Sequence, residues 1–246
     1  MRRALYLCLA LLAAVAAPAA RLSGASETSD LARQQAKAER FFSHGEWLNA
    51  SASYVLLSTE YPRNTDFYAR AVVSQYMSGD TIGTMSVLRR SMLNDVPIDS
   101  LLGQVNVLSK QAGNAPLYRN VLTDLRKNSP WLTRNIDLRL LDYYTSRDDG
   151  PEMIRMARLL LAASPDNERL RMILARGYLI DGQFGAAEAV WRRILAETPD
   201  NVDVLLWLGT LYLNTGSHDT AMPLLRKAYD LRPTPYLRQL LEKHHN

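Results

Sequence analysis

Prolines recur at an almost constant interval along this chain of 246 residues. Successive members of the series are 33 to 35 residues apart: Pro62, Pro97, Pro130, Pro165, Pro199 and Pro233. A series of glycines, with gaps of 32 to 37 residues, falls about midway between them: Gly45, Gly79, Gly113, Gly150, Gly182 and Gly216. A fixed period of this length indicates an array of similar units, each made of two halves.

Each half has the periodicity of a helix. In the last unit, apolar side chains follow one another at steps of three and four residues, as in Val202, Leu205, Leu208 and Tyr212, which is typical of an amphipathic helix. The midway glycine permits the positive φ that a tight turn between helices needs. The proline ends the second helix because it lacks an N–H and clashes with the preceding turn. Each unit is therefore predicted to be a helical hairpin.

The last two units share residues at matching positions. They are Leu208, Gly209, Tyr212, Gly216, Ala221, Ala228 and Pro233 in one unit, and Leu174, Ala175, Tyr178, Gly182, Ala187, Trp191 and Pro199 in the other. This pattern resembles the tetratricopeptide repeat family. In that family, small residues at the eighth and twentieth positions let the two helices approach closely, and an aromatic residue at the eleventh position fills the seam to the neighbouring hairpin. The resemblance implies an all-α fold, a right-handed superhelix (α-solenoid) of about six hairpins with a C-terminal capping helix.

The register of the resemblance predicts the boundaries of the repeat domain, residues 31–246. Its units are about 31–64, 65–98, 99–133, 134–167, 168–201 and 202–235. The cap is predicted over 235–246, with Thr234 as the N-cap and Pro235 at the first helical position. A polar terminal helix of this kind shields the last apolar face of a solenoid.

Three features depart from the family pattern. Val72 and Asn106 occupy the small eighth position of their units, and Tyr118 occupies a small twentieth position. We therefore expect wider packing or a shifted register in the second and third units. Pro223 lies inside the second helix of the last unit and is expected to bend it.

The N-terminus reads as an export signal over residues 1–25. Arg2 and Arg3 precede an uncharged run from Ala4 to Ala20, and small residues suitable for cleavage follow, as in a secretory signal peptide. The alternative is a retained membrane anchor, although the run is short for a span of ~20 residues. Residues 26–30 are expected to be a flexible lead-in. These features predict a periplasmic protein, or one anchored in the inner membrane if the signal is retained.

The sequence contains no motif for catalysis, for a metal or for a cofactor. It has no HExxH pair, no Cys or His spacing for zinc, no glycine-rich phosphate loop and no GxSxG elbow. Removal of residues 1–25 takes away three arginines, which leaves 26 of the 29 Lys and Arg residues beside 25 Asp and Glu residues. This near balance gives no support for nucleic acid as a partner.

The resemblance implies that the first helix of each hairpin lines a concave groove. Its candidate contacts, with Trp207 added as a possible aromatic contact, are Tyr76, Asp142, Arg169, Met172, Arg176, Asp203, Leu206, Trp207 and Thr210. Arg169 and Arg176 are seven residues apart and share a helix face, so they could bind an acidic group or a carboxylate. Alternatively, Asp142 and Asp203 in the neighbouring units neutralise them.

These features together predict a non-catalytic scaffold or adaptor for protein–protein interaction in the bacterial cell envelope. Its partner is a protein or peptide segment held in the concave groove. An alternative from another class is a glycan-binding component of a nutrient-uptake system, because related helical repeats occur in such systems.

Overall fold

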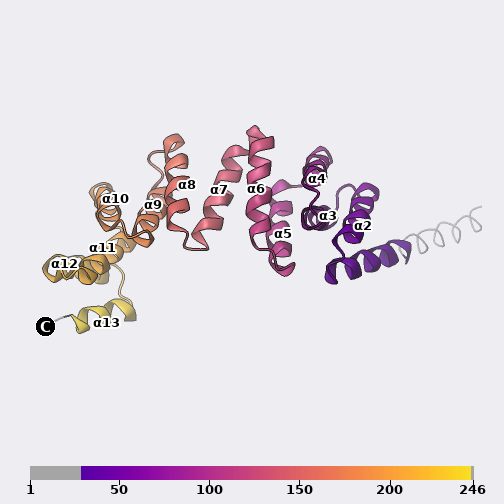
Figure 1. Cartoon of the computed structure of the whole chain (residues 1–246). Helices are drawn as coiled ribbons and strands as arrows, with labels where there is room; N and C mark the ends of the chain where they lie inside the picture. Colours follow the sequence, from indigo (N-terminus) through magenta and orange to yellow (C-terminus); the bar gives the residue numbers. More distant parts are fainter. Residues whose placement is uncertain (1–28, 245–246) are drawn as a thin grey trace, which may run out of the picture. The chain divides into compact units, whose positions relative to one another are not determined.

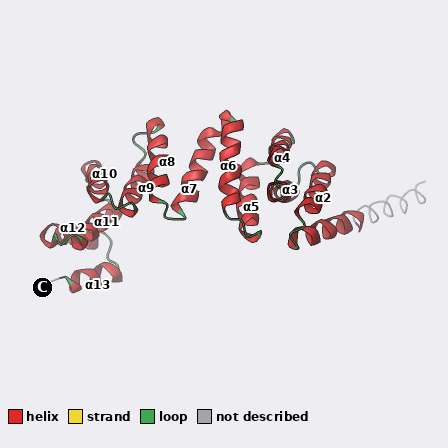
Figure 2. Ribbon diagram, viewed as in Figure 1, coloured by secondary structure: helices red, strands yellow, loops and turns green. Residues whose placement is uncertain are grey.

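The computed structural model describes residues 29–244, and the expected signal peptide lies outside these residues. All regular elements of the described residues are helical (Figure 2). The helix over residues 29–43 already contains Ser29 and Asp30, which the sequence assigned to a flexible lead-in. One physical reason is an ion pair, 2.6 Å long, between the carboxylate of Asp30 and the guanidinium of Arg33 one turn later.

Helices alternate with short turns along the whole described chain (Figure 1). After the helix over residues 29–43 they are α2 (Trp47–Glu60), α3 (Thr65–Met77), α4 (Thr81–Leu93), α5 (Ile98–Gln111), α6 (Pro116–Asn128), the short 3₁₀ helix η1 (Pro130–Leu132), α7 (Thr133–Thr145), α8 (Gly150–Ala163), α9 (Glu168–Ile180), α10 (Phe184–Glu197), α11 (Val202–Asn214), α12 (His218–Leu231) and α13 (Pro235–Lys243). The fold is therefore an all-α repeat of helical hairpins.

The chain divides into two compact units, with the boundary between Asp124 and Leu125 inside α6. In the N-terminal unit, α3 packs against α2, α4 and α5. In the C-terminal unit, each helix from α7 to α13 packs against the next one along the chain. Each unit thus builds its core from the apolar stripes of successive hairpins.

The turns inside the hairpins follow the predicted glycine series with one exception. The backbone is left-handed, with φ between 71° and 85°, at Gly45, Gly79, Gly113, Gly182 and Gly216. In the turn between α7 and α8, the left-handed residue is Asp148, with a φ of 53°. Gly150, which the sequence placed in the turn series, is instead the first residue of α8.

The prolines of the series follow the second helix of each hairpin, as predicted. Five of the six prolines lie two residues beyond the last helical residue, and Pro97 lies four residues beyond the end of α4. Three of these prolines are followed two residues later by an asparagine that caps the next helix: Asn64, Asn167 and Asn201. Each of these side chains accepts a hydrogen bond from a backbone N–H in the first turn, at 3.0 to 3.2 Å.

Aromatic residues at the eleventh repeat position close the seams between hairpins, as the resemblance implies. Tyr178 and Tyr212 are buried, and each hydroxyl bonds to an arginine from the hairpin before it. Arg158 Nη2 donates to Tyr178 at 2.6 Å, and Arg192 Nη2 donates to Tyr212 at 2.7 Å. The seam therefore combines a buried ring with a polar contact at its edge.

The expected departures are accommodated in different ways. Val72 and Tyr118 are buried in the core of the N-terminal unit. The helix α5 begins at Ile98, one residue before the expected unit boundary, so the fully buried Val105 takes the eighth position and Asn106 is only half-buried. Pro223 lies inside α12, which continues without interruption from His218 to Leu231.

Candidate binding groove in the C-terminal unit

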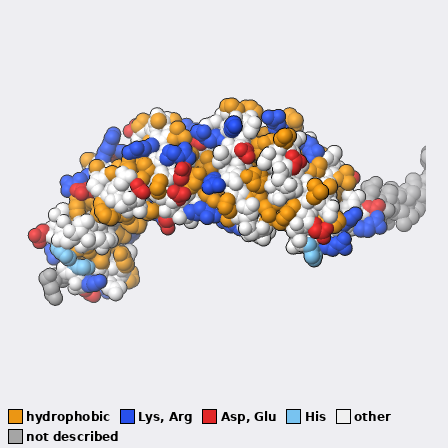
Figure 3. All heavy atoms as spheres, viewed as in Figure 1, with side chains coloured by type: hydrophobic (Ala, Val, Ile, Leu, Met, Phe, Trp, Pro, Cys, Tyr) orange, Lys and Arg blue, Asp and Glu red, His pale blue; other side chains and the backbone are white. Residues whose placement is uncertain are grey.

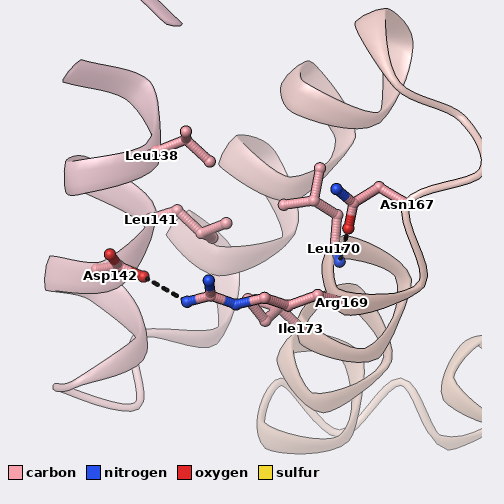
Figure 4. A pocket seen from close by; sticks show the side chains of 7 residues that line it. All are labelled: Leu138, Leu141, Asp142, Asn167, Arg169, Leu170 and Ile173. Carbon is pink, nitrogen blue, oxygen red and sulfur yellow. Dashed lines mark hydrogen bonds and ion pairs between the residues drawn. The ribbon is translucent and has the colours of Figure 1, made fainter. Parts of the chain in front are cut away.

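A recess of about 300 Å³ lies between α7 and α9, the first helices of two successive hairpins (Figure 4). We call it the α7–α9 recess. It is lined by Leu138, Leu141, Asp142, Asn167, Arg169, Leu170 and Ile173. Both helices present their side chains to the recess because hairpins of similar length stack in register, which brings equivalent faces of neighbouring first helices together.

Aliphatic side chains form most of the lining. Leu141 and Leu170 are buried, Ile173 is half-buried and Leu138 is exposed at the edge. Figure 4 shows the aliphatic groups of both helices directed into the space between them. Such a surface favours an apolar side chain of a partner, because contact removes apolar area from water.

An ion pair crosses the recess from one helix to the other. Arg169 Nη2 lies 3.4 Å from Asp142 Oδ1, and the two side chains are 79% and 64% exposed. An ion pair this exposed contributes little to stability. Both charged groups therefore remain accessible to the polar groups of a partner.

The second arginine of the predicted pair has a different partner. Arg176 Nη2 lies 2.5 Å from the carboxylate of Asp148, in the turn between α7 and α8. Asp203 pairs with Arg232 and not with either groove arginine. The alternative that neighbouring carboxylates neutralise the arginines is therefore correct for Asp142 and wrong for Asp203. Figure 3 shows that basic and acidic side chains are mixed over the visible surface of the molecule.

The capping of α9 holds one end of the recess. Asn167 lies at the N-cap of α9, and its side chain accepts a hydrogen bond from Leu170 N–H at 3.0 Å. This bond satisfies one of the free donors of the first turn. The sequence Pro165-Asp166-Asn167 thus sets where α9 begins and hence where Arg169 lies.

The remaining predicted contacts do not line this recess. Met172 on α9, and Leu206 and Thr210 on α11, are half-buried. Trp207 is 43% exposed and stacks on the buried Trp191, with ring centroids 6.3 Å apart and an interplanar angle of 14°. Tyr76 is half-buried on α3 and belongs to the N-terminal unit.

Sequence reasoning missed the aliphatic floor and one of the carboxylates. Leu141, Leu170 and Ile173 lie outside the repeat positions assigned to the groove. The sequence therefore identifies them only as apolar residues of amphipathic helices. Asp148 lies outside the repeat positions assigned to the groove as well, in the turn between α7 and α8. Its pairing with Arg176 depends on how the α7–α8 hairpin stacks on α9, which is a tertiary relationship.

The N-terminal unit has recesses of its own around Arg70. One of about 480 Å³ lies beside Glu39, Phe42 and Trp47, and one of about 380 Å³ lies beside Asp66, Gln104 and Val107. The guanidinium of Arg70 pairs with both Glu39 and Asp66 and lies over the rings of Phe42 and Tyr54. The positive charge of Arg70 is therefore neutralised by two carboxylates of the same unit.

Tyr54 completes this cluster and is its titratable group. The phenol is fully buried, and its hydroxyl donates to Glu39 Oε2 at 2.8 Å. Burial, together with the hydrogen bond to Glu39, raises the pKa of Tyr54 well above its ordinary value. The cluster therefore contributes a buried, protonated tyrosine to the core of the N-terminal unit.

Residues 29–244 contain neither a metal-binding cluster nor a helix suited to cross a membrane. No group of three or more His, Cys, Asp and Glu side chains in this range could hold a metal ion. None of the helices in the same range combines the length and the apolar character that a bilayer span requires.

The structure is a stack of helical hairpins with glycines in the turns, tyrosines in the seams and a recess on the surface. This is the architecture of helical-repeat interaction proteins. Residues 174–235 match the tetratricopeptide repeat model of that family, which supports the resemblance found in the sequence. That family fold is generally a non-catalytic scaffold for protein–protein interaction.

Among curated proteins, the chain is similar to "Cellulose synthase 2 operon protein C" of Komagataeibacter xylinus. The two are 30% identical over 148 residues, which is 58% of this chain and 11% of that protein. The chain thus matches about a tenth of the length of this relative.

Solved structures with a similar arrangement of helices have low sequence identity. MamA MSR-1 gives a TM-score of 0.47 at 18% identity, covering 68% of this chain and 95% of that one. The TPR2AB domain of yeast Sti1, in its pHSP90 complex, gives a TM-score of 0.41 at 14% identity, covering 89% of this chain and 100% of that one.

Proposed function

We propose that this chain is an exported scaffold of the bacterial cell envelope whose C-terminal unit binds a segment of a partner protein in the α7–α9 recess. The segment places an apolar side chain against Leu141, Leu170 and Ile173. Its polar or charged groups meet Asp142 and Arg169 at the mouth of the recess.

The observation that carries this proposal is the combination of an aliphatic floor with an accessible ion pair in one recess. A small apolar centre with polar groups at its rim is typical of protein interaction sites. The apolar floor supplies affinity, and the paired charges select the orientation of the segment. The net charge of the pair is zero, so the proposal favours an apolar segment with polar flanks over a strongly acidic one.

The location in the envelope is supported by the sequence of the N-terminus. Its basic start, uncharged run and small residues match an export signal. Mass spectrometry of the mature N-terminus tests this part: a start near residue 26 supports export with cleavage, and an intact Met1 contradicts cleavage.

The binding proposal is tested by affinity purification after crosslinking in intact cells of the native host. Ile173→Asp places a charge on the floor of the recess, and Arg169→Glu replaces the ion pair by two like charges. We expect both variants to lose the same partner, while Arg155→Glu on the outer face of α8 retains it. A partner captured equally by all three variants contradicts a role for the recess. Arg176→Glu, in the same experiment, measures whether the groove extends two turns further along α9.

A second candidate is glycan binding at Trp207. The observation in its favour is the exposed indole ring, held flat by stacking on Trp191, together with similarity to a protein named for a cellulose synthase operon. Glycan-array screening of the mature chain and of Trp207→Ala separates the two candidates. Glycan binding that the substitution removes favours this second function.

A further inference from the structure

The outer face of α4 exposes large apolar side chains that the interaction groove does not use. Ile82 is 85% exposed and Leu93 is 83% exposed, and Leu48 on the neighbouring α2 is 76% exposed. These helices touch directly, because Arg90 Nη2 donates to Ser58 Oγ at 2.7 Å. Large apolar groups this exposed on two contacting helices are candidates for an interaction surface.

Charge on this face is scarce compared with the equivalent helices of the C-terminal unit. Arg89 is the one charged residue among the exposed positions of α4, and α2 has only Glu60 at its end. The second helices of the later hairpins expose two to four charged residues each: Arg155 and Arg158 on α8; Arg192, Arg193 and Glu197 on α10; and Asp219, Arg226, Lys227 and Asp230 on α12. The N-terminal unit thus differs from the other unit at the same position of the repeat.

After Thr81, the intervals between the exposed residues of α4 are the same whether they are counted from the N-terminal or the C-terminal end of the helix. These residues are Ile82, Ser86, Arg89 and Leu93, at steps of four, three and four residues. All four lie on one face, since these steps keep close to whole turns of the helix. Their centre falls between Val87 and Leu88, and the face spans about 16 Å.

We propose that this face is the contact between two copies of the chain, with the two α4 helices antiparallel across a two-fold axis. The symmetric spacing then sets Ile82 of each copy against Leu93 of the other copy. It sets Ser86 against Arg89, so that each guanidinium donates to a hydroxyl across the axis.

A second copy fits this face better than other occupants. An isologous contact requires one surface to be complementary to itself, and steps of four and three residues are also the spacing along a seam between two helices. A membrane surface is disfavoured because a helix lying on lipid carries several basic residues on its polar side, whereas α4 has only Arg89 and Arg90, and Arg90 is bonded to Ser58. The contact is small by the standard of stable interfaces, so we expect a weak dimer that depends on concentration.

Analytical ultracentrifugation of the full chain over a range of concentrations tests self-association. We expect the weight-average mass to rise towards twice the monomer value, and Ile82→Glu or Leu93→Lys to keep the chain monomeric. Leu159→Glu, on the outer face of α8, is the matched control and should leave the dimer unchanged. Because Ile82 and Leu93 are exposed, circular dichroism should show the same helix content in all variants. A wild-type chain that stays monomeric at every concentration overturns the proposal.

Mixing the two variants tests the antiparallel geometry itself. In a mixed dimer, the carboxylate introduced at position 82 of one copy faces the ammonium introduced at position 93 of the other, and the unchanged Ile82 and Leu93 meet at the opposite end. We therefore expect an equimolar mixture of Ile82→Glu and Leu93→Lys to associate, although neither variant does so alone. A parallel arrangement gives no such rescue, so its absence overturns the proposed geometry.

A third variant separates self-association from other uses of an apolar face. Ser86→Glu places a carboxylate opposite Arg89 of the second copy, and we expect it to strengthen the dimer severalfold at low salt. A charge added to a face that meets lipid would weaken binding. Flotation with phosphatidylglycerol vesicles measures that alternative, and a chain that binds vesicles through Ile82 without self-association overturns the proposal.

Discussion

Gly150 at the start of α8 contacts Gly177 in α9: a Cβ built on Gly150 would lie 3.0 Å from the carbonyl oxygen of Gly177. From the other side, a Cβ on Gly177 would lie 3.1 Å from Ile154 Cγ1 and 3.2 Å from Met153 Cβ. The two helices approach each other at a point where neither residue has a side chain. This close approach helps to place α9, and with it Arg169 and the α7–α9 recess.

Gly150→Ala should destabilise the protein because the new methyl group would press on backbone atoms that cannot move aside. We expect a loss of about 1–3 kcal/mol in the free energy of unfolding. Gly103→Ala is the matched control: a Cβ there meets nothing within 4 Å inside α5, and we expect a gain of up to about 1 kcal/mol. Urea denaturation of both variants measures these changes, and equal effects would contradict the close contact.

Arg126 and Asp137 form an ion pair that connects α6 to α7. Arg126 Nε lies 2.5 Å from Asp137 Oδ1, and the carboxylate side chain is only 5% exposed. Arg126→Met leaves this carboxylate without its cation, so we expect a loss of about 2–3 kcal/mol in the free energy of unfolding. The double variant Arg126→Met with Asp137→Leu should recover most of that loss. A double variant as unstable as the single one would show that packing, and not the unpaired charge, causes the effect.

The raised pKa of Tyr54 predicts a loss of stability at alkaline pH. An unfolded chain releases the phenol proton at a pH of about 10, while the folded protein retains it to higher pH because of burial and the Glu39 hydrogen bond. The unfolded state therefore binds fewer protons in this window, and the free energy of unfolding falls as pH rises above about 10.

Tyr54→Phe tests this origin of the alkaline instability. At pH 7 the variant should be less stable by about 1 kcal/mol, because it lacks the hydrogen bond to Glu39. The difference from the wild type should then narrow between pH 9 and pH 11 in urea denaturation experiments. Parallel curves over this range would exclude Tyr54 as the titrating group.

The groove ion pair should matter for binding far more than for folding. Because Arg169 and Asp142 are both mostly exposed, we expect Arg169→Ala to change the free energy of unfolding by less than about 0.5 kcal/mol. The same variant should capture less partner in the crosslinking experiment. Thermal unfolding monitored by circular dichroism measures the first effect. A large drop in stability would assign the pair a structural role.

The repeat, its turns and its seams were predictable because they follow from short stretches of sequence. A proline two residues after a helix, a glycine with positive φ and a tyrosine at the eleventh position act on their own hairpin or the next one. The same local rules explain the exceptions. In the turn before α8 an aspartate takes the left-handed position, so the glycine in the series serves close packing instead.

The partners of the groove residues depended on how the hairpins stack in three dimensions. Arg169, Arg176 and Asp142 were identified from their repeat positions, but the partner of Arg176 proved to be Asp148 and that of Asp203 proved to be Arg232. These pairs join residues 28 and 29 positions apart, so side-chain direction and the stacking of the hairpins decide which carboxylate each arginine reaches. Helix positions and repeat length were therefore encoded locally in the 246 residues, whereas the recess and its ion pairs arose only when neighbouring hairpins packed together.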